Sequence, residues 1–209
     1  MNAARRIGRP PKEEAGPTRQ RLLDVALDLF SEHGFAGTSV RMIARAAEVS
    51  DSGLYAHFPS KQAIFDELKG GESPYAAVNL LSKFPVAEHQ HDPVSFLRSL
   101  TATLLKAWDS RRGRKFTKLL LREDLSDGGD DYKAMLDELC DHLAPYFAQW
   151  RKEGTLRETE LNAQELAWEY IAAVGYTRLV YLQGGPATRE FGHKAANRHV
   201  EFFLDAIRR

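Results

Sequence analysis

The sequence is poor in cysteine and has no excess of charge of either sign. Its 209 residues include a single cysteine, Cys140, so the chain forms no intramolecular disulfide and suits a reducing compartment, with this thiol expected in the core. Lysine and arginine together number 29, as do aspartate and glutamate, so the formal net charge of +0 does not by itself indicate a polyanionic partner. A content of 43% apolar residues nevertheless predicts a folded, soluble chain.

Long hydrophobic runs are also missing. The most apolar stretch, residues 166–182, is interrupted by Glu169 and Arg178 and is too polar to cross a bilayer. No segment resembles a signal peptide. We therefore expect a cytoplasmic protein with no membrane partner.

The motifs of catalytic and metal sites are missing as well. There is no glycine-rich phosphate loop, nucleophile elbow or dinucleotide fingerprint. His89 and His91 lie two residues apart, as do Cys140 and His142, but neither pair has the second matching pair that a metal site needs. The acidic run at residues 127–131 is expected to be a solvated loop. We therefore expect no enzymatic activity, no metal and no cofactor.

The strongest pattern that is present lies between residues 39 and 58. A first segment, 39–47, has apolar residues at helical intervals, and a second, 51–58, has Leu54 and Phe58 four residues apart. Only residues 48–50 separate the two segments. This spacing predicts a helix-turn-helix, which places a short helix in the major groove of DNA.

The ends and the outer faces of these two helices can also be predicted. Thr38 or Ser39 can cap the first helix, and Ser50 or Asp51 the second, because a side-chain oxygen accepts an unpaired first-turn N–H. Arg41 and Arg45 lie off the apolar face of the first helix. The groove-facing candidates on the second helix are Asp51, Ser52, Tyr55, Ala56 and His57.

Further helices are expected on both sides of this motif. A helix that opens at Pro17 or Thr18 is predicted by apolar residues at three- and four-residue intervals, and Gly34 is suited to end it. Phe35 is then expected to fold back onto the core. Another helix is predicted over residues 60–69, followed by a break at residues 70–74 that we take as a domain boundary.

These segments together resemble the DNA-binding domain of the TetR family of transcriptional regulators. The resemblance covers about the first third of the chain and departs from the usual pattern at Asp51, Gly53 and Ala56, which bears on the operator sequence. It rests on residues 18–26, Gly34, Phe35, Thr38, Ser39, Val40, Ile43, Ala44, Val49, Ser50, Leu54, Tyr55, His57, Phe58, Ser60 and Lys61.

The resemblance implies that double-stranded DNA is a partner of this chain. Tyr55 and Lys61 are expected to contact phosphates and Ser52 to contact base edges, although Tyr55 could instead pack inside the three-helix unit. The full set of expected DNA-binding residues is Arg9, Thr38, Ser39, Arg41, Ser50, Asp51, Ser52, Gly53, Tyr55, His57 and Lys61.

The basic tail at residues 1–16 is expected to be a flexible arm, since it is rich in proline and charge. Its Gly8-Arg9-Pro10 core resembles the AT-hook, in which an extended arginine lies in the narrow minor groove of A·T-rich DNA. The alternative is a solvated terminus without a DNA contact.

The remainder of the chain is predicted to be helical. Helical spacing predicts a helix from Pro93 that closes at residues 111–113, a shorter one around residues 116–121, and a long one over residues 132–151 with a kink at Pro145. No alternating apolar pattern requires a sheet. The expected fold is therefore all-α: a helix-turn-helix DNA-binding domain at residues 17–70, and a larger helical ligand-binding and dimerisation domain at residues 71–209.

The last two helices predict a homodimer. Apolar residues between 166 and 182 point in nearly every direction, so this helix must be covered on both sides, either by a second copy or within a monomer core. The family resemblance implies a four-helix dimer interface. The residues expected in it are Tyr170, Val174, Tyr181, Phe191, Ala195 and Phe203.

The resemblance further implies a repressor of a palindromic operator that an unknown small-molecule effector releases. Such pockets are mostly apolar, which makes five aromatic residues pocket candidates, although each could be plain core. Two alternatives stay open: an architectural or activating helix-turn-helix protein without a ligand, and a helical enzyme or binding protein with a decayed DNA domain. The pocket candidates are Trp108, Phe116, Trp150, Trp168 and Tyr176.

Overall fold

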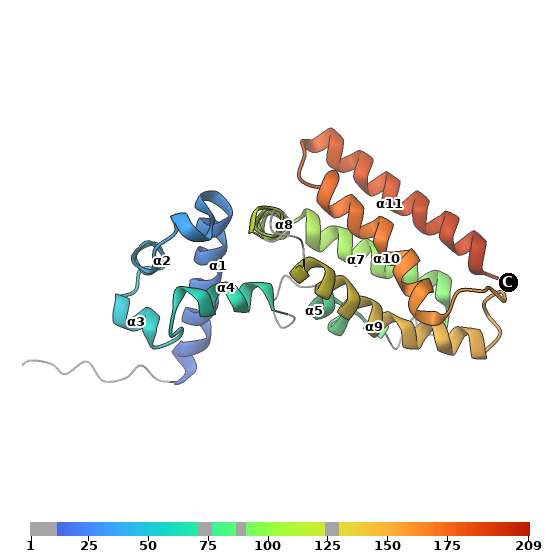
Figure 1. Ribbon diagram of the computed structural model, residues 1–209, viewed down its shortest axis with the longest axis horizontal. Helices are drawn as coiled ribbons and strands as arrows, with labels where there is room; N and C mark the ends of the chain where they lie inside the picture. Colours follow the sequence, from blue (N-terminus) through green and yellow to red (C-terminus); the bar gives the residue numbers. More distant parts are fainter. Residues whose placement is uncertain (1–11, 71–76, 87–90, 124–129) are drawn as a thin grey trace, which may run out of the picture. The chain divides into compact units, whose positions relative to one another are not determined.

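The computed structural model describes residues 12–70, 77–86, 91–123 and 130–209, and these residues form ten helices (Figure 1). The predicted all-helical fold is confirmed: within the described ranges the only extended pairing is an isolated bridge between Leu156 and Arg208. The chain divides into two compact units, Met1–Asp66 and Glu67–Arg209.

The first unit is built on α1 (Lys12–Gly37), α2 (Val40–Ala46), α3 (Asp51–Tyr55) and the start of α4 (Lys61–Lys69). Helix α1 begins five residues before Pro17, where the sequence predicted its start, so this proline lies inside the helix. Pro17 is the sixth residue of α1, past the N–H groups that lack partners at a helix start, so the helix passes through it with one backbone hydrogen bond fewer.

The C-terminal end of α1 turns at Gly34, as predicted. Its φ of 76° and ψ of 170° are not helical, so the last residues of α1 follow a kink. A glycine adopts this backbone conformation without the steric cost that a Cβ would add. The kink brings Phe35 back onto the core, where its ring lies 4.7 Å from that of Phe65 and 5.6 Å from that of Phe30.

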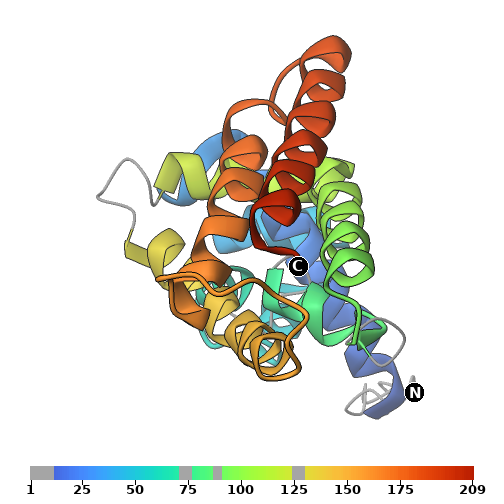
Figure 2. The same cartoon turned by 90° about the vertical axis from the view of Figure 1, so that its right-hand side faces the viewer.

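The second unit contains α5 (Ala77–Ser82), α7 (Pro93–Asp109), α8 (Arg111–Glu123), α9 (Asp130–Lys152), α10 (Ala163–Val180) and α11 (Pro186–Ile207). Helices α7, α9, α10 and α11 form a bundle in which α10 packs on α9, α11 and α7 (Figure 2). Its core is rich in aromatic rings, including those of Phe96, Phe147 and Trp150. Helix α5 was not predicted from the sequence.

The junction between α7 and α8 differs from the prediction, because residues 111–113 begin α8 instead of closing α7. Ser110 serves both helices: its Oγ donates to the carbonyl of Ala107 and accepts the N–H of Gly113 at 2.9 Å. A Cβ at Gly113 would lie 2.2 Å from the Ala107 carbonyl oxygen. The sharp corner therefore depends on a glycine, and no local sequence pattern indicates this close approach.

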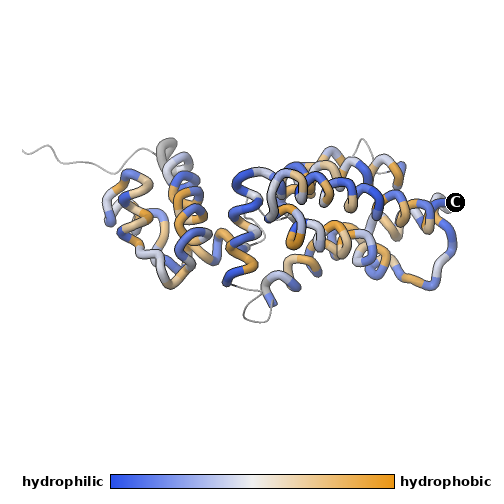
Figure 3. Tube along the Cα trace, turned by 90° about the horizontal axis from the view of Figure 1, so that it is seen from above, coloured by the Kyte–Doolittle hydropathy of each residue, from blue (hydrophilic) through white to orange (hydrophobic). Residues whose placement is uncertain are grey.

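Apolar and polar residues alternate along the helices of both units (Figure 3). This interleaving is typical of helices that bury one stripe and expose the other. In the described part of the chain, no helix is both long and apolar enough to span a membrane.

Candidate functional site

The turn between α2 and α3 has the geometry of a helix-turn-helix. Ser39 caps α2 by accepting the N–H of Met42, and Ser50 caps α3 by accepting the N–H of Gly53 at 3.1 Å. Glu48, at φ 55°, adopts a left-handed conformation in the turn. Such a conformation is uncommon for a residue with a side chain and persists where the surrounding packing fixes it.

The inner faces of α2 and α3 hold this geometry against α1. Ile43 and Ala44 of α2 are buried, as are Leu54 of α3 and Phe58 just after it. A Cβ at Gly53 would lie 3.2 Å from the Ser50 Oγ, so the absence of a side chain suits the capped first turn of α3. The packing fixes which side of α3 faces outward.

The outer face of α3 carries Asp51, Ser52, Tyr55 and Ala56, all exposed. Tyr55 is 53% exposed, so it does not pack inside the three-helix unit, which was the alternative left open by the sequence. Arg41 on α2 is also exposed and its Nε lies 3.6 Å from the Asp51 carboxylate. The face thus offers hydroxyl groups, one carboxylate and a neighbouring guanidinium to a partner.

Other residues of the expected DNA-binding set lie differently. Ser39 and Ser50 are exposed and serve as helix caps, and Gly53 and His57 are half-buried. Arg9 lies outside the described residues, so the suggested minor-groove arm has no structural description.

Two residues of the expected DNA-binding set, Thr38 and Lys61, make hydrogen bonds inside the unit. Thr38 is buried, and its Oγ1 donates to the carbonyl of Gly34 at 2.8 Å. The Lys61 Nζ donates to the backbone carbonyls of Phe35 at 2.6 Å and Thr38 at 2.8 Å. The Phe35 carbonyl also accepts the N–H of Thr38 at 3.3 Å, so the ammonium of Lys61 adds a charged donor to the two carbonyls that follow the kink at Gly34. Both side chains therefore contribute to the internal structure of the first unit, and a contact of either residue with DNA stays a prediction.

The aromatic residues expected to line a pocket separate into two groups. Trp108, Phe116 and Trp150 are buried within the second unit. Trp168 and Tyr176 are instead 52% and 57% exposed, so they cannot be walls of an interior pocket. Their spacing of eight residues along α10 places them on one face of the helix, two turns apart.

The residues expected at the dimer interface also separate. Tyr170, Val174 and Phe203 are buried in the core of their own chain, so they are not available to a second copy. The Tyr170 hydroxyl, for example, lies 2.8 Å from the Thr101 Oγ1 inside the bundle. Tyr181 and Ala195 are half-buried.

A different set of apolar side chains is exposed on α10 and α11. We call this set the α10/α11 apolar face: Trp168, Tyr176, Val180, Phe191 and Phe202. Phe191 is its one member among the residues that the sequence predicted at the dimer interface. On α10 this face follows apolar residues at every fourth position, from Trp168 through Tyr176 to Val180. The sequence does not distinguish this row, because α10 also carries apolar residues that are buried.

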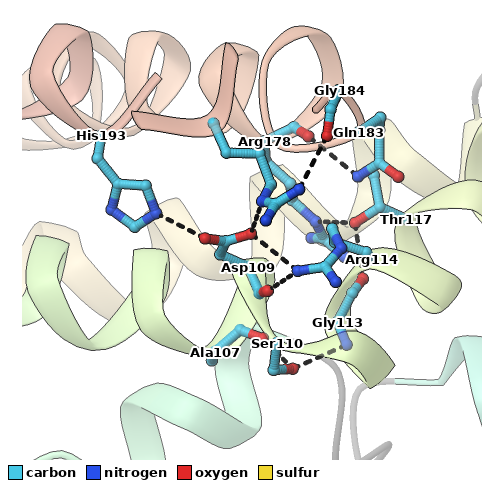
Figure 4. Close-up of polar contacts among 11 residues, drawn as sticks. Ala107, Asp109, Ser110, Gly113, Arg114, Thr117, Arg178, Gln183, Gly184 and His193 are labelled. Atoms are coloured by element: carbon cyan, nitrogen blue, oxygen red, sulfur yellow. Dashed lines mark hydrogen bonds and ion pairs between the residues drawn. The ribbon is translucent and has the colours of Figure 1, made fainter. Parts of the chain in front are cut away.

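A buried arginine near the end of α10 was not singled out from the sequence. Arg178 is 1% exposed, and its Nε donates to the Thr117 Oγ1 of α8 at 2.8 Å (Figure 4). Its guanidinium carbon lies 5.0 Å from the ring centroid of Trp108 and 5.4 Å from that of Phe116. The sequence does contain a signal for it, because Arg178 is a charged residue inside an otherwise apolar helix. A charged side chain that is buried in this way needs a hydrogen-bonding or ionic partner.

A second polar cluster surrounds Asp109, at the end of α7. Its carboxylate receives Arg114 Nη1 and Arg189 Nε, each at 2.9 Å, and lies 3.1 Å from His193 Nε2 (Figure 4). These contacts tie α7 to the starts of α8 and α11. Beside them is an open groove of about 440 Å³, lined by Ala102, Leu105, Lys106, Asp109, Ser110, His193 and Asn197.

No metal site is found in the described ranges, since no three His, Cys, Asp or Glu side chains there could hold an ion together. His89 lies outside these ranges. Cys140 is buried, and burial, with Asp137 and Asp141 nearby, raises the pKa of its thiol to about 11. A buried thiol of this kind is unreactive.

The chain matches a family model in its first unit, sequence relatives over longer stretches, and a solved structure over most of its length. Residues 22–68 match the family described as "Bacterial regulatory proteins, tetR family". The chain is 38% identical over 112 residues to the HTH-type transcriptional regulator AcrR of Shigella flexneri, covering 52% of this chain and 50% of AcrR. The chain therefore spans about half the length of that relative.

Two further matches extend into the second unit. The HTH-type transcriptional repressor NicS of Pseudomonas putida is 28% identical over 152 residues, covering 70% of this chain and 69% of NicS. The structure of a SmeT–triclosan complex superposes with a TM-score of 0.70 at 21% identity, covering 92% of each chain. That likeness establishes a shared fold.

Proposed function

Because the chain belongs to the TetR family of bacterial regulatory proteins, we propose that it is a DNA-binding transcriptional regulator, acting as a homodimeric repressor of a palindromic operator. A small-molecule effector releases it from that operator. The observation that carries the proposal is the outer face of α3, which is capped by Ser50, held by Leu54 and Phe58, and free of the unit's own core.

The α3 face has the chemistry for reading DNA. The Ser52 hydroxyl can donate to and accept from base edges, and the exposed Tyr55 hydroxyl can donate to a phosphate. Arg41 and Arg45 of α2 are exposed beside it and supply positive charge for the backbone. Phosphate contacts are local, so a net charge of zero over the whole chain is compatible with this role.

A second copy of the chain is the proposed cover for the α10/α11 apolar face. Five large apolar side chains on two adjacent helices form a patch of the kind that marks an interaction surface. A two-fold axis through this face would pair α10 and α11 with their symmetry mates in a four-helix interface. Dimerisation would present two α3 helices, which a palindrome requires at a separation of roughly 34–36 Å.

The effector site is assigned to the second unit. The SmeT structure, which has the same fold, is a complex with the small molecule triclosan. Of the expected pocket residues, Trp108 and Phe116 remain candidates because they are buried beside a polar group, Arg178. The effector and operator would favour different states of the protein, so each must weaken the binding of the other by the same factor.

The DNA-binding role is tested by selecting fragments of genomic DNA on the purified chain at physiological salt and sequencing what is retained. Enrichment of one palindromic motif is expected. The variant to compare with the wild type is Tyr55→Ala, which alters only an exposed side chain. It should lower enrichment of the motif at least about tenfold while the fold is kept. Retention of unrelated fragments, equally by both proteins, would instead favour an architectural protein.

The proposed role also sets the expected cellular location and excludes catalysis as the main activity. A repressor acts where the chromosome is, so we place the chain in the cytoplasm. We assign it no enzymatic reaction and no cofactor. An activating role remains the alternative, and the position of the selected motif relative to promoters distinguishes it from repression.

A further inference from the structure

Arg178 carries a buried charge that has no acidic partner among the described residues. Within the described residues its Nη2 has no hydrogen-bond partner, although the side chain is only 1% exposed. Its Nε is satisfied by Thr117, a neutral acceptor whose own hydroxyl donates to the Gly113 carbonyl at 3.0 Å. A buried ion that is not paired carries a large desolvation cost, so an arginine in this state calls for an explanation.

Asp109, the acidic residue drawn in Figure 4, does not compensate the charge of Arg178. The Asp109 carboxylate is already engaged by Arg114, Arg189 and His193. Burial lowers the pKa of Arg178 to about 10, and among the described groups only Tyr132 acts in the opposite direction. The guanidinium therefore remains charged at neutral pH, with an unsatisfied donor.

A second unsatisfied donor lies beside Arg178. Trp108 is buried, and within the described part of the chain its Nε1 has no hydrogen-bond partner. The guanidinium carbon of Arg178 lies 5.0 Å from the centroid of the Trp108 ring. Two buried N–H donors in one small cluster suit a ligand that brings acceptors and no donors, such as a carboxylate or phenolate.

The walls of this cluster are aromatic. The ring centroid of Phe116 lies 5.4 Å from the guanidinium carbon of Arg178. Phe116 belongs to α8 and Trp108 to α7, so the two rings come from either side of the α7–α8 corner. Tyr132 of α9 is buried, and its hydroxyl lies 3.4 Å from the position of a Cβ at Gly175, one turn before Arg178 on α10. Rings on several sides favour a flat, apolar ligand body.

We infer that Arg178 anchors the effector, and that the effector is a small aromatic acid whose anionic group accepts hydrogen bonds from Arg178 Nη2 and Trp108 Nε1. This inference rests on the proposed function, since it specifies the ligand of the effector site. The ring of the acid would lie against Trp108 and Phe116. An anion here compensates a charge that the described residues leave without an acidic partner.

The closed state of the cluster connects binding to regulation. Arg178, Trp108, Phe116 and Thr117 are each buried, and Thr117 joins α8 to α10 through Arg178. A ligand that reaches Nη2 must therefore part α8 from α10. Such a ligand binds the parted state better than the closed one, and this difference in affinity is what shifts an equilibrium between two states.

The test uses the purified full chain and three probes: benzoate, salicylate and 1-naphthoate, each compared with its neutral carboxamide. Thermal unfolding is measured at increasing probe concentration. We expect at least one acid to raise Tm by about 3 °C or more and its carboxamide not to do so. The acid that raises Tm should also release DNA from the protein.

The decisive variant is Arg178→Met, which should lower the affinity for that acid by about 10- to 100-fold and remove its preference over the carboxamide. It should still fold, because replacing an unpaired buried ion by an apolar side chain is often neutral or stabilising. Arg157→Met removes one exposed positive charge in the same unit and is the matched control. Trp108→Phe removes the second donor but keeps an aromatic ring at this position, and it should weaken binding of the acid.

Three results would overturn the inference: no acid raises Tm, acids and carboxamides raise it equally, or the Arg178→Met variant keeps the response of the wild type. Selection of genomic fragments on the same preparation separates this failure from failure of the proposed function. A recovered operator without a response to acids contradicts only the effector assignment. Failure to recover any operator contradicts the regulatory role itself.

Discussion

The Lys61 Nζ lies 4.1 Å from the ring centroid of Phe35 and donates a 2.6 Å hydrogen bond to the carbonyl of the same residue. The first residue of α4 is thereby tied to the kinked end of α1, where a second carbonyl, of Thr38, accepts from the same ammonium. The contact orients α1 relative to the start of α4 and so supports the frame that holds α2 and α3. An indirect role in DNA binding follows, through the stability of the first unit.

Replacing Lys61 by methionine should destabilise the first unit. The change keeps the apolar stem but leaves the carbonyls of Phe35 and Thr38 without their charged donor, at a cost of about 1.5–3 kcal/mol. Hydrogen exchange of backbone amides in α1 to α3 measures the loss of protection. Gln62→Met, at the exposed neighbouring position, is the control and should cost about 0.5 kcal/mol or less. Unchanged protection with weakened DNA binding would instead support a direct phosphate contact by Lys61.

A charge in the α10/α11 apolar face should separate the proposed dimer. Tyr176 is 57% exposed within one chain, so Tyr176→Asp is expected to leave the helical circular dichroism unchanged while weakening self-association at least about 100-fold. Light scattering at micromolar concentration measures the mass. Leu161→Asp adds the same charge at another exposed apolar residue and should leave the dimer intact. A monomeric wild-type protein would refute the dimer.

A methyl group at Gly113 should destabilise the second unit by about 3 kcal/mol, because the α7–α8 corner has no room for it. The added Cβ would lie 2.2 Å from the Ala107 carbonyl oxygen and 2.8 Å from the backbone of Trp108. Urea unfolding measures the effect. Gly185→Ala is the control in the same unit, since a Cβ there meets nothing within 4 Å, and the loss of a glycine cap should cost at most about 1 kcal/mol. Equal costs for the two variants would contradict the tight corner.

The Cys140 thiol should resist alkylation in the native protein and contribute to the pH dependence of stability. Its pKa is raised to about 11 by burial in the folded state, against about 8.5 in an unfolded chain. Folding therefore favours the neutral thiol: the stabilisation is complete below pH ~8.5 and is lost as pH rises towards 11.

Two measurements check this prediction. Iodoacetamide at pH 8 should modify Cys140 in urea but not in buffer. The fall in unfolding free energy between pH 9 and 11 should be smaller for Cys140→Ala than for the wild type. Rapid modification of the native protein would show that the thiol is accessible.

The amino-acid sequence is sufficient to predict features that depend on neighbouring residues. Ser39 and Ser50 cap their helices, and Leu54 and Phe58 face the core, because capping and helical periodicity act over three or four residues. The all-helical fold follows from the same periodicity. For these reasons the position of the α3 face can be predicted from local sequence patterns.

Features that depend on residues far apart in the chain could not be predicted. The carbonyls that bind Lys61 lie 23 and 26 residues away, so no local pattern shows that its ammonium is occupied. Helix α10 is apolar on nearly every side, so periodicity could not tell the buried Tyr170 from the exposed Tyr176. Arg178 showed only as an interruption of that helix, because its relation to Thr117 and Trp108 arises from packing among α7, α8 and α10.

The central claim is that two copies of this chain read one palindrome through their α3 helices. Hydroxyl-radical footprinting of the fragment enriched by the wild-type protein tests it most directly. The account predicts two protected half-sites of equal extent, centred about 10–10.5 base pairs apart or at a multiple of that spacing, with protection lost in Tyr55→Ala. A single protected half-site, or protection without defined boundaries, would contradict it.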